Sequence, residues 1–176
     1  MVDLETLDTS ANTVVTSIGI VEFDKNEVRQ AFEVHIDIQN QLEFFDRTVS
    51  ASTMLWWLEQ SGTARGALIK GQANAVPLGE ALNQVSKFIQ HTKENQAILW
   101  GNGAAFDNAK LEELYIANKS DAPWKFWNDR CYRTLKATYP NIKADRAGTH
   151  HKAVDDAYTQ AMHLIEINKQ AGGIYL

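Results

Sequence analysis

The spacing of apolar and polar residues changes along this chain. It predicts strands in the first part and mostly helices later. Residues 13–23 are rich in β-branched side chains, which is typical of a strand. Residues 31–38 alternate apolar with polar positions, which predicts a half-exposed neighbouring strand. The polar segment 24–27 between them supplies a turn. We therefore expect two paired strands joined by that turn.

From Ser50 the apolar spacing becomes helical, and Ser52 or Thr53 could cap the first helix. A short apolar run at 97–100 ends at Gly101, which is typical of a buried central strand. Helical spacing is found in four further segments, which are 78–91, 105–118, 130–138 and 152–169. With a first strand at the start of the chain, this order predicts an α/β fold in which a mixed sheet is flanked by helices.

Length and composition are those of one globular domain spanning residues 1–176. With 44% hydrophobic and 22% charged residues the chain can build a core, and its apolar runs are too short to span a bilayer. No secretory leader precedes Asp3, and the single Cys131 excludes an intramolecular disulfide, so we expect a cytoplasmic protein without membrane contact. The net charge of −5 argues against a tight duplex-binding module, because such binding depends on Lys and Arg.

Two acidic residues at the start of the chain are the first candidates for chemistry. Asp3 and Glu5 are two residues apart, so on a strand both side chains point to the same face. Clustered carboxylates can hold a pair of metal ions, and oxygen-rich ligand sets select Mg²⁺ or Mn²⁺. Charged pairs are usually solvated, but this pair precedes an apolar sheet pattern. Only Met1 and Val2 stand ahead of it, and a chain terminus frays unless it is tied down.

A third acidic residue, Asp107, follows the apolar run at 97–100 and a turn flanked by glycines. That position corresponds to the carboxyl end of a sheet strand, where ligands bind in open α/β folds. The alternative is that Asp107 only stabilises the N-terminus of the next helix. Asn102 lies between the two glycines of the turn, where it could approach a nucleotide or simply hold the turn.

The segment before the last helix contains His151 and Asp156, five residues apart. Five residues correspond to about 140° around an ideal helix, so the two converge only if His151 lies on the preceding loop. A histidine titrates near neutrality, which suits a general base. His150 and Asp155 have the same spacing and are interpreted as ordinary polar residues near a helix start.

Together, "DLET", "GNGAAFDN" and "HHKAVDDA" resemble the three motifs of the DnaQ-like 3′–5′ exonucleases with a DEDDh active site. The resemblance extends over nearly the whole chain. It is greatest to small phage and prophage exonucleases and to related bacterial exoribonucleases, through "TMLWWLEQS", "WGNGAAFDN" and "WNDRCYRT". It implies a ribonuclease H-like fold whose first three strands are antiparallel. It also implies a metal-dependent enzyme that releases nucleoside 5′-monophosphates from the 3′ ends of single-stranded or overhanging RNA or DNA.

The resemblance further implies a role for individual residues. Two divalent ions, Mg²⁺ or Mn²⁺, would be bound by the carboxylates of Asp3, Glu5, Asp107 and Asp156. His151 would be the general base, with Glu5 the second catalytic residue. Contacts to the terminal nucleotide would come from Thr6 and Leu7. Asn102 and Trp57 are further candidates for substrate contact, on the grounds of their own positions in the sequence. Many proteins of this kind pair, so the chain could form a homodimer, and an exposed aromatic residue such as Trp124 or Trp127 could serve its interface.

Two pairs of residues near these motifs have more than one reading. Trp56 and Trp57 are about 100° apart on an ideal helix, so one can be buried while the other faces outward. An exposed tryptophan could stack on a base, worth about 1–3 kcal/mol, or both could be packing residues. Arg130 and Arg133 could bind phosphate or pair with surface acids.

Two other functions compete with a 3′–5′ exonuclease. The chain could be a catalytically idle ribonuclease H-like module that only binds nucleic acid, although such a module needs no base at His151. It could also be a metal-dependent endonuclease, which would cleave a circular substrate that offers no end.

Overall fold

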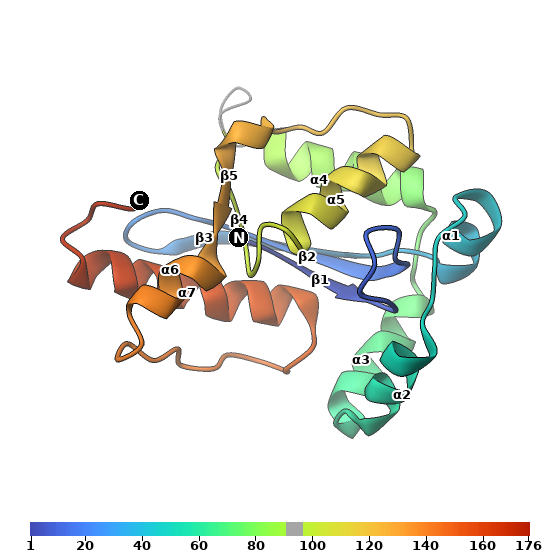
Figure 1. Ribbon diagram of the computed structural model, residues 1–176, viewed down its shortest axis with the longest axis horizontal. Helices are drawn as coiled ribbons and strands as arrows, with labels where there is room; N and C mark the ends of the chain where they lie inside the picture. The colour runs from blue at the N-terminus through green and yellow to red at the C-terminus, as the bar shows by residue number, and fades with distance from the viewer. Residues whose placement is uncertain (91–96) are drawn as a thin grey trace.

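The computed structural model describes residues 1–90 and 97–176, and within them a five-stranded mixed sheet runs through the centre of the molecule (Figure 1). The strands are β1 (Val2–Thr6), β2 (Val15–Phe23), β3 (Val28–His35), β4 (Leu99–Gly101) and β5 (Asp129–Cys131). Their order across the sheet is β3-β2-β1-β4-β5. Strands β1, β2 and β3 pair antiparallel, whereas β4 is parallel to β1 and β5 is parallel to β4. The expected α/β fold with three antiparallel first strands is confirmed.

Helices cover both faces of this sheet (Figure 1). Their bounds are α1 (Ile38–Phe44), α2 (Ala51–Glu59), α3 (Gly62–Gln72), α4 (Leu78–Gln90), α5 (Asp107–Ala117), α6 (Tyr132–Thr138) and α7 (Ala153–Gln170). Helices α4 and α5 pack on one face and α7 on the other, while α1, α2 and α3 form a group at one end of the sheet (Figure 1). No described helix is long and apolar enough to cross a bilayer.

Several expected boundaries moved, and local hydrogen bonds explain the changes. Helix α2 is capped by Ser50, whose Oγ accepts a hydrogen bond from the Thr53 N–H, rather than by Ser52 or Thr53. Helix α3 was not expected because its three glycines disfavour a helix, but Ser61 caps it. The expected helix at 130–138 is shorter, since 129–131 form β5. His91, expected at the end of α4, lies outside the described residues.

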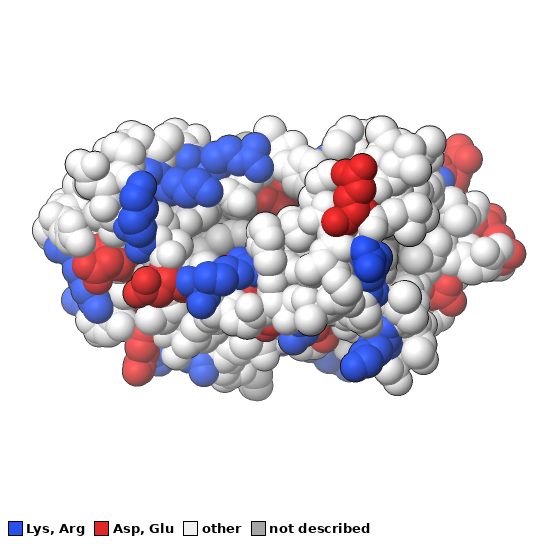
Figure 2. All heavy atoms as spheres, turned by 90° about the horizontal axis from the view of Figure 1, so that it is seen from below, with Lys and Arg blue, Asp and Glu red and all other residues white. Residues whose placement is uncertain are grey.

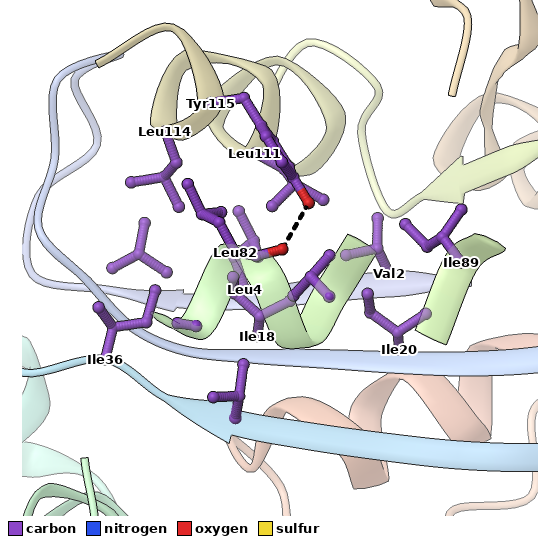
Figure 3. Packing of buried hydrophobic residues seen from close by; sticks show 14 of the residues in the cluster. Val2, Leu4, Ile18, Ile20, Ile36, Leu82, Ile89, Leu111, Leu114 and Tyr115 are labelled. Atoms are coloured by element: carbon purple, nitrogen blue, oxygen red, sulfur yellow. Dashed lines mark hydrogen bonds between the residues drawn. The ribbon is translucent and has the colours of Figure 1, made fainter. Parts of the chain in front are cut away.

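Alternation along β1 separates the core from the functional side of the sheet. Val2 and Leu4 point into a buried cluster formed with α4 and α5 (Figure 3). Within that cluster the Tyr115 hydroxyl donates to the Leu82 carbonyl at 3.1 Å, so its buried polar atom is satisfied (Figure 3). Asp3 and Glu5 occupy the alternate positions, and therefore belong to the opposite face, the one that α7 covers.

The N-terminal end of α7 lies directly on the sheet beside Asp3. Asp3 pairs with Gly19 of β2, and a Cβ atom added to Gly19 would lie 2.2 Å from the Ala153 carbonyl carbon. Only glycine permits this approach. The first strand does not fray, because the Met1 amino group is buried and donates to the Val21 carbonyl at 2.8 Å. The fold therefore holds Asp3 and the start of α7 in a fixed relation.

The two tryptophans named as interface candidates differ in exposure. Trp124 is buried, and its Nε1 donates to Asp129 Oδ1 at 3.0 Å, so its expected role as an exposed contact was wrong. Trp127 is exposed and packs edge-on against Phe126. The expectation of a homodimer stays a prediction.

Candidate active site

Four carboxylates from three separate elements line one cavity of about 400 Å³. Asp3 and Glu5 come from β1 and Asp156 from the first turn of α7, and single ligand atoms of these three residues lie within 4.8 Å of one another. Asp107 is the first residue of α5, and its Oδ1 accepts a hydrogen bond from the Leu4 N–H of β1 at 3.2 Å. The carboxyl end of β4 brings Asp107 to this position because β4 lies parallel beside β1.

The acidic cluster is electrostatically unfavourable when it stands alone. Burial raises the pKa of Asp3 well above its usual range, and the charges of Asp107, Glu5 and Asp156 raise it further. Burial raises the pKa of Glu5 to about 8, with Asp156 and Asp107 as the next causes. Burial also raises the pKa of Asp107 to about 6. Such a group of carboxylates is stabilised by protons or by cations.

The chemistry of the donor set fits divalent cations. The cavity also contains Asn102 and Gln160, and each has a buried side-chain oxygen with no hydrogen-bond donor among the described residues. Carboxylate and amide oxygens are the ligands that Mg²⁺ and Mn²⁺ prefer. Gln160 in addition donates from Nε2 to Asp3 Oδ1 at 2.7 Å, which holds that carboxylate in place. The residues present therefore fit the metal ions implied by the sequence.

His151 lies on the loop before α7, as convergence with Asp156 required. Its backbone has φ of 62°, a left-handed conformation that is uncommon outside glycine. The conformation is held by the His151 N–H, which donates to Asp156 Oδ2 at 2.9 Å. Burial lowers the pKa of His151, nearby His150 lowers it further, and Asp156 opposes them. The lowered pKa favours the uncharged ring, which can accept a proton.

The two neighbours with the same spacing differ from His151 and Asp156. The Asp155 carboxylate accepts from the Thr149 N–H at 2.8 Å and lies 3.4 Å from Lys152 Nζ, so it holds the loop rather than facing the other carboxylates. His150 is exposed and its ring lies 3.8 Å from that of His151. Its interpretation as an ordinary polar residue is incomplete, because His150 borders the cavity and one of its ring nitrogens lies within 4.8 Å of ligand atoms of His151 and Asp156.

Of the candidate residues for substrate contact, two line a cavity and two are buried. Asn102 lines the acidic cavity, and Thr6 lines a second cavity of about 340 Å³ beside it. Leu7 is buried, its N–H donates to the Val14 carbonyl, and its carbonyl accepts from the Ser50 N–H, so none of these groups is free to meet a nucleotide. Trp57 is only 3% exposed, and its Nε1 donates to the Thr6 carbonyl at 2.9 Å. Direct contacts by Leu7 and Trp57 are therefore not supported, and Trp57 instead positions Thr6.

The sequence left the role of Trp56 open, and it did not single out two other residues of the site, Arg146 and Gln160. Trp56 is 41% exposed, packs edge-on against His151 with ring centroids 4.8 Å apart, and lines the second cavity with Phe106. Arg146 forms an ion pair with Asp156. Gln160 follows Asp156 by one helical turn, so the i, i+4 spacing is a signal that could have found it. No comparable local signal exists for Arg146, which comes from an irregular loop.

Comparison with known proteins identifies a family and a shared fold. Residues 1–168 match the family model described as the 3′–5′ exoribonuclease Rv2179c-like domain. A search of curated proteins found no significant match. Two solved structures are similar in fold. One is the nuclease domain of 3′hExo, a DEDDh family member, bound to rAMP, with a TM-score of 0.68, 11% identity and coverage of 98% of this chain and 92% of that one. The other is cell-death related nuclease 4 (CRN-4), with a TM-score of 0.54, 14% identity and coverage of 96% and 63%.

Proposed function

The chain belongs to the Rv2179c-like 3′–5′ exoribonuclease domain family, and we propose that it is a metal-dependent 3′–5′ exonuclease. Its substrate is the 3′ end of single-stranded or overhanging nucleic acid, and its product is a nucleoside 5′-monophosphate. The observation that carries the proposal is the convergence of Asp3, Glu5, Asp107 and Asp156 with His151 in one cavity. The description of the family favours RNA as the first substrate to test.

Two divalent ions, Mg²⁺ or Mn²⁺, would be held by Asp3, Glu5, Asp107 and Asp156. When bound, such ions activate a water molecule and stabilise charge on a phosphodiester undergoing in-line displacement. They would also relieve the repulsion that raises the pKa values of Asp3 and Glu5. Two of the carboxylates are oriented by hydrogen bonds. Gln160 donates to Asp3, and the N–H of Leu4 donates to Asp107.

His151 acts as the general base. An uncharged ring nitrogen of His151 accepts a proton from the attacking water, whose oxygen forms a new bond to phosphorus. The P–O3′ bond of the last phosphodiester breaks, and the leaving 3′ oxygen takes up a proton to become the new 3′-hydroxyl. The Asp156 carboxylate accepts a hydrogen bond from the His151 N–H and so fixes the position of His151 on its loop. The rings of Trp56 and Trp57 pack against the imidazole and limit its movement.

The test is digestion of RNA and DNA of one sequence, each with a 3′ overhang and a 5′ label, in Mg²⁺ or Mn²⁺. Products shortened one nucleotide at a time from the 3′ end, with release of mononucleotides and complete inhibition by EDTA, are expected. Asp156→Asn removes a ligand charge and should abolish turnover, while Asp155→Asn is the matched control on the same helix and should retain it.

Two results would overturn the proposal. Cleavage of a circular single strand of the same composition would show an endonuclease. Binding of the overhang without hydrolysis in either metal, with Asp156→Asn behaving as the wild type, would show an idle binding module.

A further inference from the structure

The acidic cavity has a cationic border that the proposed chemistry does not use. Figure 2 shows the molecule from the side of the loop between α6 and α7, where Lys and Arg side chains gather around a hollow. The cavity that contains the four carboxylates is also lined by Arg133, Lys136 and Arg146. Arg146 is paired with Asp156, whereas the other two come from α6 and have no such partner among the described residues.

Arg133 and Lys136 are exposed and lie three residues apart on α6, so they share one helix face. Within residues 1–90 and 97–176, neither side chain has a hydrogen bond or an ion pair. Lys136 Nζ lies 5.2 Å from the centroid of the Tyr132 ring, which is a cation–π distance. Two like charges one turn apart repel each other, and an anion between them would relieve this.

Other cations near this border are held by protein groups. Arg130 donates from Nη1 to the carbonyls of Trp127 and Asp129, and it does not line the cavity. Lys143 Nζ donates to the Pro140 carbonyl. Arg133 and Lys136 therefore differ from Arg130 and Lys143, because their side chains have no hydrogen bond or ion pair to any of the described residues and both line the acidic cavity.

Gly103 leaves the space that Arg133 occupies. A Cβ atom at Gly103 would lie 3.2 Å from the guanidinium carbon of Arg133, and Gly103 has φ of 125°, a conformation suited to glycine. Arg133 is close enough to Asp107 to lower the pKa of that carboxyl against the dominant effect of burial. The guanidinium thus lies next to the carboxylates but has no ion-pair contact with them.

The two cavities that meet at Glu5 differ in chemistry. The smaller one is walled by Trp56 and Phe106, and none of the described residues that line it is Lys or Arg. The larger one has the cationic border of α6. Both are lined by Leu4, Glu5 and Phe106, so the two cavities adjoin each other. An apolar wall suits a base, whereas free cations suit phosphates.

We propose that Arg133 and Lys136 bind the phosphates of the substrate strand on the 5′ side of the scissile bond, so that the strand crosses α6. This inference rests on the proposed function and adds the direction of the strand. The terminal nucleoside lies on the side of Trp56 and Phe106, and the remaining strand leaves over α6. Single-stranded substrates gain affinity from this border through their phosphates and not through their sequence.

The experiment compares the effect of each substitution on two substrates, one with upstream phosphates and one without them. One is a single-stranded oligonucleotide of five residues, and the other is the 4-nitrophenyl ester of a nucleoside 5′-monophosphate, which has a scissile phosphodiester and no upstream strand. Arg133→Gln, Lys136→Gln and the double variant are measured on both, over a range of salt concentration. Arg130→Gln is the matched control, since its guanidinium is held outside the cavity.

The double variant should lose at least tenfold more kcat/KM on the oligonucleotide than on the ester, mainly through KM. The dependence of log(1/KM) on log salt should become shallower by about 0.7 for each phosphate contact removed. Arg130→Gln should match the wild type on both substrates. Equal losses on the two substrates, or no loss on either, would overturn the inference.

Failure of the proposed function has a separate signature. If the wild type hydrolyses neither substrate in Mg²⁺ or Mn²⁺, the exonuclease proposal itself is overturned. The cationic border is then judged by the affinity of a labelled oligonucleotide for the protein, measured by fluorescence anisotropy. If Arg133→Gln leaves the Kd unchanged, the proposed phosphate binding by the cationic border is overturned as well. If Arg133→Gln raises the Kd and Arg130→Gln does not, phosphate binding by the border is supported.

Discussion

Replacing Glu5 by glutamine should stabilise the metal-free protein, although it should inactivate the enzyme. Glu5 is 8% exposed, and burial together with Asp156 and Asp107 raises its pKa from 4.5 to about 8. Glutamine has nearly the same shape without the charge. The variant therefore removes the unfavourable ionisation and leaves the packing of β1 in place.

The size and sign of the effect follow from proton linkage. The folded state retains a proton on Glu5 that the unfolded chain releases above pH 4.5, so stability falls as pH rises and the loss is complete only above about pH 8. Within this window each pH unit lowers the free energy of unfolding by about 1.4 kcal/mol. Between pH 4.5 and pH 7 the loss amounts to about 3 kcal/mol. Asp107 adds a loss of the same sign between pH 3.8 and about 6. For a chain of this length, 3 kcal/mol corresponds to a rise in Tm of roughly 6–12 °C.

The assay is thermal unfolding in EDTA and in excess Mg²⁺, from pH 5 to pH 8. In EDTA, Glu5→Gln should melt above the wild type at pH 7 and lose less stability as pH rises. In Mg²⁺ the wild type should gain stability from binding and the variant should gain less. Glu33→Gln should have the opposite effect, because Glu33 accepts a hydrogen bond from the Val154 N–H and its pKa is lowered, so its replacement should destabilise. Part of that loss is offset, since the charge of Glu33 is a minor cause of the raised pKa of Glu5. A Glu5→Gln protein that melts no higher than the wild type in EDTA would refute the electrostatic account of the cluster.

Three further predictions address the base, the exposed ring and the sheet contact of α7. His151→Ala should lower kcat by about 10²–10⁴-fold while stabilisation by Mg²⁺ persists, and a kcat within tenfold of the wild type would exclude a general base. Trp56→Ala should raise KM for an oligonucleotide by the equivalent of about 1–3 kcal/mol of stacking, as steady-state kinetics can show. An unchanged KM would mean that Trp56 is only a packing residue. Gly19→Ala should cost at least about 1–3 kcal/mol in urea unfolding, because the new Cβ would lie 2.2 Å from the Ala153 backbone. Unaltered stability would show that α7 can move away from β2.

Local rules were sufficient for much of the sheet and for part of the site. Two-residue spacing placed Asp3 and Glu5 on one face of β1, and alternation placed Val2 and Leu4 on the other. The requirement that His151 lie on a loop followed from helical geometry alone. These features depend only on residues a few positions apart, so they can be predicted from the spacing in the sequence.

The remaining features depended on contacts between distant segments. Asp107 reaches Asp3 because β4 inserts beside β1, and no spacing in the sequence specifies that strand order. The choice between Trp56 and Trp57 was decided by the hydrogen bond from Trp57 to the Thr6 carbonyl, 51 residues away. Arg133 and Lys136 of α6 could be related to the site only after the fold had placed them in one cavity with the carboxylates of β1 and α7. Sequence by itself determined which residues could bind metal and on which face of β1 two of them lie. The packing of α7 against Gly19 and the pairing of β4 with β1 decided that the carboxylates share one cavity, because only tertiary contacts bring together groups that are far apart along the chain.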